Sequence, residues 1–320
     1  MTAVRRVLFV VAALVLVAQA FRPVFVDAQA GLTALRREDH YRTVNGLRLH
    51  FVSWPADTVV ERPTIILLHG IARHAHTFDH IAPTLFRTHN VIALDMRGHG
   101  DSGWSPEGAY LVQDYVKDLE GLVDQRRLRK VTLLGNSTGG RVAQVYAGLH
   151  PDRVDKLVVE DVGPERPQNI ADAFARRVEQ EKNGWASEDE LVAQLVTQNR
   201  RTPEPLLRTY AHFGLKKLDG GPGNNVGAAP RYVWKRDPNL VKGFVETELW
   251  ESVRKITAPT LYVIGGGSRI VPPETQDKLK QTLPNVRIVV MPGLGHYPDE
   301  EDTTGFMNIV GEFLALRPSA

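Results

Sequence analysis

A serine lies between two glycines where the sequence changes from a strand-like to a helix-like pattern. The apolar run 131–134 leads into Gly135-Asn136-Ser137-Thr138-Gly139, and a helical pattern covers about 138–149. In a strand–turn–helix of this kind the serine has a strained backbone, and its hydroxyl stands exposed at the end of the strand. Side chains at the two glycine positions would collide with the neighbouring strand or helix. The pattern makes Ser137 a candidate nucleophile, and an ordinary glycine-rich turn is the alternative.

The chemistry of such a serine needs an imidazole, and the chain has histidines beside its predicted strands. His69-Gly70 ends one apolar run, the segment 95–102 (Asp-Met-Arg-Gly-His-Gly-Asp-Ser) follows a second, and Gly295-His296 follows the last. A serine alkoxide is inaccessible at neutral pH, so a hydrogen-bonded imidazole must take the proton during attack. The imidazolium ion then needs a carboxylate on its other nitrogen.

Taken together, these motifs resemble the α/β-hydrolase fold superfamily over about 40–163 and 250–316. The resemblance implies that Ser137 is the nucleophile and His296 the general base. It also implies that the backbone N–H groups of Ile71 and Thr138 form an oxyanion hole, which stabilises the transition state. A capped loop histidine at 296 and a plain turn residue at 71 are the structural alternatives.

The catalytic acid departs from the usual pattern of these relatives. Most members place an aspartate in the loop after the penultimate strand, where this chain reads Gly-Gly-Gly-Ser-Arg-Ile-Val-Pro over 265–272. Ser268 stands at the expected position, and a hydroxyl cannot balance an imidazolium charge. Some members use an acid at the end of the strand before the cap, which favours Asp161 here. Glu160, Glu274 or no strong acid remain as alternatives.

The identity of the nucleophile also separates this chain from some relatives. In haloalkane dehalogenases and soluble epoxide hydrolases the resemblance implies an ester on an aspartate, so a serine argues against both activities. His74, His76 and His80 have a spacing that can hold a metal, but the loop after His-Gly in this superfamily usually carries polar residues at the pocket mouth. We therefore expect no metal and no organic cofactor, and we interpret His99 as a structural residue.

Several aromatic or polar side chains are candidates for an apolar substrate pocket, with core packing as the alternative for each. The candidates are His74, Phe78, Trp185, Tyr210, Phe213 and Trp234.

The elements that must position these residues follow an alternating pattern. Asn45-Gly46 separates two alternating runs within 41–52, which predicts a hairpin because both turn positions need a positive φ. Continuous apolar runs bounded by turn residues predict buried parallel strands at 64–69, 91–95, 131–135, 157–161, 260–264 and 286–291. Helical patterns cover about 77–89, 113–127, 138–149, 273–282 and 303–316. The sequence predicts an α/β fold: a mostly parallel sheet with helices on both faces and an antiparallel hairpin at its edge.

The alternation breaks at 164–250, where the pattern indicates helices without strands. Ser187-Glu188-Asp189-Glu190 predicts a helix start, other helices are expected at 170–181 and 205–213, and 219–225 indicates a loop. We predict a helical cap at 164–250 on a core made of 31–163 and 251–320.

Composition and charge exclude several classes. The chain has 320 residues, 39 Lys and Arg against 37 Asp and Glu, and no cysteine. It lacks the basic stripe that nucleic-acid binding requires, and disulfide scaffolds, thiolate metal sites and cysteine nucleophiles are excluded.

The N-terminus has the pattern of an export signal. Arg5-Arg6 precede an apolar run of about a dozen residues, followed by Ala18-Gln19-Ala20 and Ala28-Gln29-Ala30. We predict a signal peptide within 1–30, hence a periplasmic or secreted protein, with an uncleaved membrane tether at 7–21 as the alternative.

The sequence thus predicts a serine esterase for a small to medium apolar ester or lactone. A C–C bond or amide hydrolase of the same fold is the first alternative, and a ligand sensor without catalysis is the second. The sequence indicates neither the exact substrate nor the oligomeric state.

Overall fold

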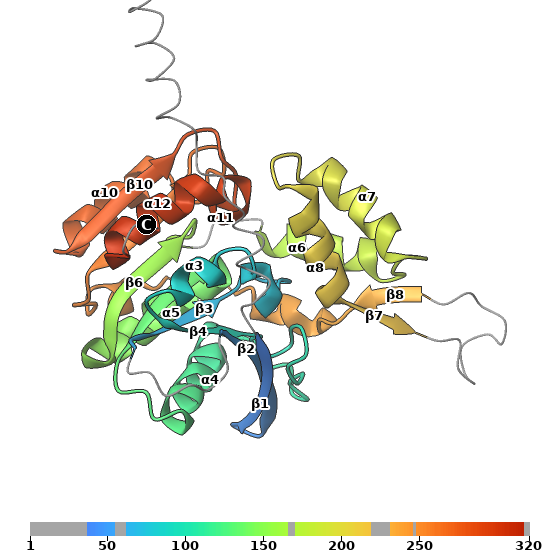
Figure 1. Ribbon diagram of the computed structural model, residues 1–320, viewed down its shortest axis with the longest axis horizontal. Helices are drawn as coiled ribbons and strands as arrows, with labels where there is room; N and C mark the ends of the chain where they lie inside the picture. The colour runs from blue at the N-terminus through green and yellow to red at the C-terminus, as the bar shows by residue number, and fades with distance from the viewer. Residues whose placement is uncertain (1–36, 55–61, 166–169, 219–230, 246–247, 317–320) are drawn as a thin grey trace, which may run out of the picture. The chain divides into compact units, whose positions relative to one another are not determined.

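The computed structural model describes residues 37–54, 62–165, 170–218, 231–245 and 248–316 (Figure 1). The expected signal or tether within 1–30 and the expected loop at 219–225 lie outside these residues. No helix in the described ranges is both long and apolar enough to cross a membrane.

An eight-stranded sheet forms the centre of the described chain, in the order β1-β2-β4-β3-β5-β6-β9-β10. Strands β4, β3, β5, β6, β9 and β10 run parallel, and β1 and β2 are antiparallel at one edge. The prediction of a mostly parallel sheet is confirmed. The strands are β1 (Glu38–Val44), β2 (Leu47–Trp54), β3 (Thr64–Leu68), β4 (Asn90–Leu94), β5 (Val131–Asn136), β6 (Val154–Glu160), β9 (Thr260–Gly265) and β10 (Val286–Met291).

Both faces of the sheet are covered because its central strands are apolar throughout. In β3, Ile66 and Leu68 belong to one apolar cluster, which includes side chains of α4 and α5, whereas Ile65 and Leu67 belong to another, which includes side chains of α3 and α12. The covering α-helices are α3 (Ala82–Phe86), α4 (Val112–Gln125), α5 (Thr138–Leu149), α9 (Trp250–Val253), α10 (Pro273–Thr282), α11 (Pro298–Glu301) and α12 (Thr303–Leu314). Short 3₁₀ turns are η1 (Ala75–Phe78), η2 (Pro151–Arg153) and η3 (Pro238–Gly243).

The local signals explain most of these elements. Asn45 and Gly46 have φ of 49° and 79°, as the hairpin turn requires. The helix expected at 77–89 is shorter than predicted, because a 3₁₀ turn precedes it and α3 begins with a proline in its first turn.

The residues between β6 and β9 leave the sheet and form a separate group of elements, here called the inserted segment (164–250). It contains α6 (Ile170–Glu181), α7 (Glu188–Gln198) and α8 (Glu204–Gly214), and also β7 (Leu215–Leu218) and β8 (Arg231–Trp234) (Figure 1). The expectation of helices without strands is wrong, because β7 and β8 pair as an antiparallel ribbon. Both strands are only four residues long, too short for a clear alternating pattern.

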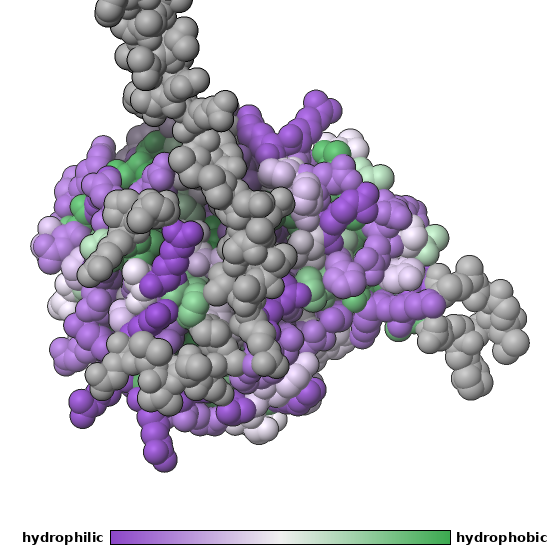
Figure 2. Space-filling model, viewed as in Figure 1, coloured by the Kyte–Doolittle hydropathy of each residue, from purple (hydrophilic) through white to green (hydrophobic). Residues whose placement is uncertain are grey.

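The inserted segment has its own small apolar core. Trp185, Leu191, Leu207 and Tyr210 are among the buried side chains that pack there. Ser187 accepts a hydrogen bond from the Glu190 N–H at 3.1 Å, as the predicted helix start requires. Hydrophilic side chains dominate the face shown in Figure 2, and the hydrophobic ones there occur in small groups.

Candidate active site

Ser137 lies in the sharp turn between β5 and α5. Its backbone has φ 50° and ψ −118°, a sparsely populated region for a residue with a side chain. A Cβ atom on Gly139 would lie 2.0 Å from the Leu68 carbonyl oxygen, and one on Gly135 would lie 2.5 Å from the Gly139 carbonyl carbon. Both positions therefore require glycine, and the close packing holds the serine in its strained conformation.

A cavity of about 300 Å³ opens beside this serine. It is lined from both the sheet and the inserted segment. The lining residues are Ile71, Ser137, Thr138, Arg141, Val162, Ile170, Ala173, Phe174, Arg177, Phe244, Ile270, His296 and Tyr297. Because most of these side chains are apolar, the cavity suits the apolar part of a small molecule.

His296 and Asp161 form a hydrogen-bonded pair at this cavity. His296 Nδ1 lies 2.7 Å from Asp161 Oδ2, and the Asp161 side chain is fully buried whereas that of His296 is 25% exposed. In the described part of the chain, no hydrogen bond involves His296 Nε2. A carboxylate on Nδ1 fixes the imidazole tautomer that leaves Nε2 as the acceptor.

The hydrogen bonds of Asp161 explain the serine at position 268. The Ser268 hydroxyl donates to Asp161 Oδ1 at 2.8 Å, and the Gly265 N–H donates to the same oxygen at 2.9 Å. The loop that carries the acid in most relatives therefore supplies donors to an acid on the neighbouring strand end. These donors direct the other carboxylate oxygen toward His296.

The two backbone groups expected at the oxyanion hole lie close to the serine. Ile71 and Thr138 line the same cavity as Ser137, and within the described ranges neither N–H donates a hydrogen bond. A Cβ on Gly70 would lie 3.2 Å from Ser137 Cβ, so the loop after β3 passes directly beside the serine. No hydrogen bond joins Ser137 Oγ to His296 among the described residues, although both side chains line the cavity.

The two alternative acids lie in different surroundings. Glu160 is fully buried, and burial, with the neighbouring Asp299 charge, raises its pKa well above the ordinary value. Its Oε1 accepts from the Asp299 N–H at 2.8 Å. Glu274 is exposed in the first turn of α10. Neither carboxylate contacts His296.

The six side chains expected at a substrate pocket do not line this cavity. Phe78 is buried beneath the sheet in one of the two core clusters. Trp185, Tyr210 and Trp234 form part of the core of the inserted segment.

The remaining two expected pocket residues stack on other rings. The His74 ring stacks on Tyr210, and its Nε2–H donates to the Tyr210 carbonyl at 3.0 Å. Phe213 stacks on His76 with ring centroids 3.7 Å apart. The sequence indicates that an aromatic side chain makes apolar contacts, but not which apolar space it fills. Here the two side chains pack where the loop after β3 meets α8.

Sequence reasoning missed the residues of α6 that do line the cavity. They are Ile170, Ala173, Phe174 and Arg177. Their spacing of three and four residues places them on one helix face, and that spacing was the available signal. Which face of α6 meets the sheet is a tertiary fact that the spacing alone does not give.

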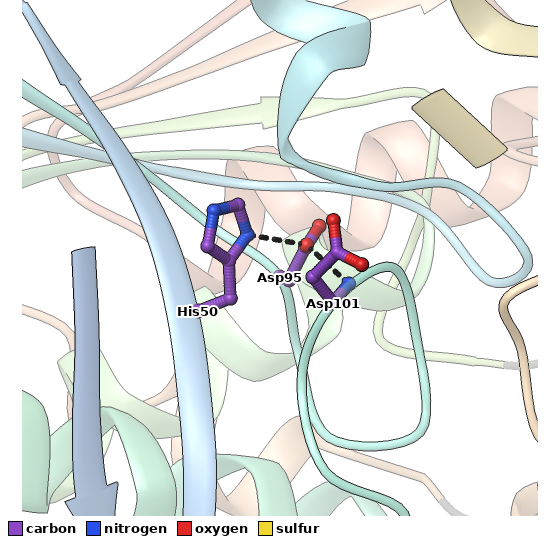
Figure 3. Close-up of side chains that lie close together, drawn as sticks. All are labelled: His50, Asp95 and Asp101. Atoms are coloured by element: carbon purple, nitrogen blue, oxygen red, sulfur yellow. Dashed lines mark hydrogen bonds and ion pairs between the residues drawn. The ribbon is translucent and has the colours of Figure 1, made fainter. Parts of the chain in front are cut away.

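A second histidine–aspartate cluster lies away from the cavity (Figure 3). Ligand atoms of His50, Asp95 and Asp101 lie within 4.8 Å of one another, which is close enough for a metal site. Asp95 already accepts three hydrogen bonds, from His50 Nδ1 at 2.7 Å and from the Ala75 and Asp101 N–H groups at 2.6 and 2.9 Å. These hydrogen bonds explain why the three residues lie together.

The histidines of the predicted metal alternative have separate partners. His76 Nδ1 lies 3.3 Å from Asp79, and His80 Nε2–H donates to the Asp299 carbonyl at 3.0 Å. Together with the His74 bond to Tyr210, these contacts point the three rings at different groups.

Comparisons with known proteins agree with this architecture. A family model described as the alpha/beta hydrolase fold matches residues 63–303. Esterase YbfF of Escherichia coli (strain K12) is 26% identical over 275 residues, covering 84% of this chain and 99% of that protein. The sn-1-specific diacylglycerol lipase ABHD11 of Mus musculus is 26% identical over 266 residues, covering 79% and 81% of the two chains. The crystal structure of E-2-(acetamidomethylene)succinate hydrolase superposes with a TM-score of 0.76 at 24% identity, covering 88% of this chain and all of that one.

Proposed function

This chain belongs to the α/β-hydrolase fold family, and on that premise we propose that it is a serine hydrolase that cleaves a carboxylic ester or lactone. The observation that carries the proposal is one cavity bordered by Ser137 and by a His296 ring whose Nδ1 is held by buried Asp161. Relatives named as an esterase and a lipase support the same class of reaction.

In the proposed acylation, Ser137 Oγ attacks the ester carbonyl carbon and His296 Nε2 takes the serine proton. Asp161 stabilises the imidazolium ion through the 2.7 Å bond to Nδ1. The tetrahedral intermediate then expels the alkoxide, which leaves as an alcohol with the proton from His296. The product is an acyl ester on Ser137.

The negative charge on the tetrahedral oxygen needs donors that are already in place. The Ile71 and Thr138 N–H groups have no partner within the described chain, and Thr138 begins α5, whose N-terminal dipole favours an anion. We assign these two groups to the oxyanion hole. Donors that are fixed before the reaction cost no reorganisation during it.

Deacylation repeats the same steps with water as the nucleophile. His296 Nε2 takes a proton from water, the hydroxide attacks the acyl carbon, and Ser137 Oγ leaves with that proton. The carboxylic acid is released and the serine hydroxyl is regenerated, so the cycle needs no cofactor.

The inserted segment acts, in this proposal, as a cap that closes the cavity. Side chains of α6 and the Phe244 side chain line the cavity together with the residues of the serine turn. A cavity of about 300 Å³ favours a small substrate, and a bound substrate beneath the cap would exclude bulk water from the intermediate.

The test is hydrolysis of a p-nitrophenyl ester series from acetate to palmitate by residues 31–320 and by Ser137→Ala. We expect turnover by the parent chain with a short-chain optimum, and loss of about 10⁴-fold or more in kcat for the variant. Mass spectrometry of the parent with a slow ester should detect an adduct on the Ser137 peptide. Equal activity of the two proteins would refute the serine mechanism, and no turnover of any ester would favour an amide or C–C hydrolase.

A further inference from the structure

We propose that the substrate carries a carboxylate, and that Arg177 binds it on the α6 side of the cavity. The inference rests on the proposed function and narrows it to esters of a dicarboxylic acid that keep one free acid group. The evidence for it is the charge of the side chains that line the cavity, not the volume of the cavity.

Arg177 is held in place by only part of its guanidinium group. Its Nε donates to Glu181 Oε1 at 2.9 Å, and its side chain is 37% exposed. Within the described ranges, no hydrogen bond involves its two terminal nitrogens. A guanidinium anchored through Nε and open at both terminal nitrogens matches the two oxygens of a carboxylate.

The anchor does not neutralise this part of the cavity wall. Glu181 is shared between two arginines, because its Oε2 also accepts from Arg236, a buried side chain. Two guanidinium groups on one carboxylate leave a net charge of +1. Glu181 further accepts from Trp234 Nε1 at 3.0 Å, so its position is fixed from the inserted segment.

The rest of the cavity supplies no competing anion. None of the described residues that line it is an aspartate or a glutamate, and a second cation, Arg141, lines it one helical turn after Ser137. Arg141 donates to the carbonyl oxygens of Gly163 and Pro164, at 3.3 and 3.0 Å. The cavity therefore combines apolar walls with positive charge, which suits an acyl chain that ends in a carboxylate.

The experiment compares two esters of equal carbon number, monomethyl adipate and methyl hexanoate, by acid release in a pH-stat. We expect the parent chain to have a higher kcat/KM for monomethyl adipate, mainly through KM. Arg177→Gln should lower the ratio of the two kcat/KM values by about tenfold or more, since a charge-assisted hydrogen bond is lost. Arg176→Gln is the matched control, because Arg176 is exposed on the same helix and does not line the cavity.

A binding measurement separates this inference from the proposed reaction. Adipate itself should bind to Ser137→Ala in calorimetry, and Arg177→Gln in that background should weaken the binding by about tenfold. Hydrolysis of methyl hexanoate without preference for monomethyl adipate would overturn the carboxylate site and leave the esterase proposal standing. Adipate binding that depends on Arg177, in a chain that hydrolyses neither ester, would support the site and refute the esterase. The site would also be overturned if Arg177→Gln changed neither the ratio of the two kcat/KM values nor the affinity for adipate.

Discussion

Two histidine–aspartate pairs in this molecule have the same geometry and opposite surroundings. In each pair the histidine Nδ1 lies 2.7 Å from an aspartate Oδ2, for His50 with Asp95 and for His296 with Asp161. The His50 side chain is 1% exposed and the His296 side chain 25%. A histidine–aspartate distance alone therefore does not identify a catalytic pair.

The two histidines differ in the partner of their second ring nitrogen, Nε2. His50 Nε2 donates to Asp39 Oδ1 at 3.0 Å, so both of its nitrogens face carboxylates; burial lowers its pKa, but the hydrogen bond and charge of Asp95 outweigh this and raise it overall. His296 Nε2 has no partner in the described part of the chain, and its ring lines the cavity of Ser137. Both nitrogens of His50 are engaged by carboxylates, whereas in the proposed mechanism His296 Nε2 takes the serine proton.

Among the substitutions in the two pairs, Asp161→Asn should have the largest effect on kcat. An amide at this position removes the charge that stabilises the His296 imidazolium and can favour the wrong tautomer, so kcat should fall by about 10³- to 10⁴-fold. Far-ultraviolet circular dichroism and the melting temperature should change little, because the substitution keeps the side-chain shape. A loss of less than tenfold in a folded variant would remove Asp161 from the proposed mechanism.

Asp95→Asn should show the opposite pattern. It removes one charge from a buried pair and leaves His50 with a weaker partner, which costs about 3–5 kcal/mol in the free energy of unfolding. The kcat of the molecules that stay folded should remain within a few-fold of the parent. Asp101→Asn is the control: the Asp101 side chain is 37% exposed and pairs with Lys235, so the loss should not exceed about 1 kcal/mol.

Some features of the site can be predicted from local sequence signals, whereas the contact between Asp161 and His296 cannot. The strained turn at Ser137, the hairpin at Asn45 and the parallel strands follow from local signals such as glycine spacing and apolar runs. That Asp161 meets His296 depends on β6 lying next to β9, which is a property of the whole sheet. The strand end after 160 is a signal for an acid, but only the assembled sheet distinguishes Asp161 from Glu160.

The inserted segment was less predictable than the sheet for a physical reason. Its helices follow from periodicity, but its strands β7 and β8 are four residues long, and its aromatic side chains pack on one another. The side chains that reach the cavity, such as Phe174 and Arg177, are identified only when the orientation of α6 is known. Local propensity sets the type of an element, and tertiary packing sets which face it presents.

Acid should destabilise the fold through histidines that belong to neither catalytic step. Burial lowers the pKa of His69 and His74 to about 3 and that of His99 to about 4. Since the unfolded chain takes up these protons first, the stability is full above about pH 6.5 and is lost as the pH falls toward the folded pKa values. The raised pKa values of His50 and Glu160 act in the opposite sense and offset part of the loss.

Urea unfolding at pH 7 and pH 5 should show a decrease of about 2–4 kcal/mol in the free energy of unfolding. His69 has the contacts expected of a neutral ring, since its Nδ1–H donates to the Gly70 carbonyl and its Nε2 accepts from the Met96 N–H at 3.0 Å. A free energy that is constant between these pH values would contradict the neutral, buried state of the three rings.

Ser268→Ala should have a smaller effect on the same chemistry. The variant removes one of the two donors to Asp161 Oδ1 and leaves the Gly265 N–H in place. We expect kcat to fall by about tenfold, which corresponds to one hydrogen bond to a charged group. KM should not change, because Ser268 does not line the cavity. A rise in KM at constant kcat would instead indicate a role in substrate binding.

Glu160→Gln should have the smallest effect, although Glu160 is next to Asp161 in sequence and equally buried. Burial and the charge of Asp299 raise the Glu160 pKa, which favours the neutral carboxylic acid, and glutamine matches that neutral form in charge and shape. The amide oxygen can still accept from the Asp299 N–H, and kcat should stay within about threefold of the parent. Glu274→Gln, at an exposed position on α10, provides the matched control. A loss for Glu160→Gln as large as that for Asp161→Asn would contradict a neutral, structural Glu160 and would show that its carboxylate also takes part in the reaction.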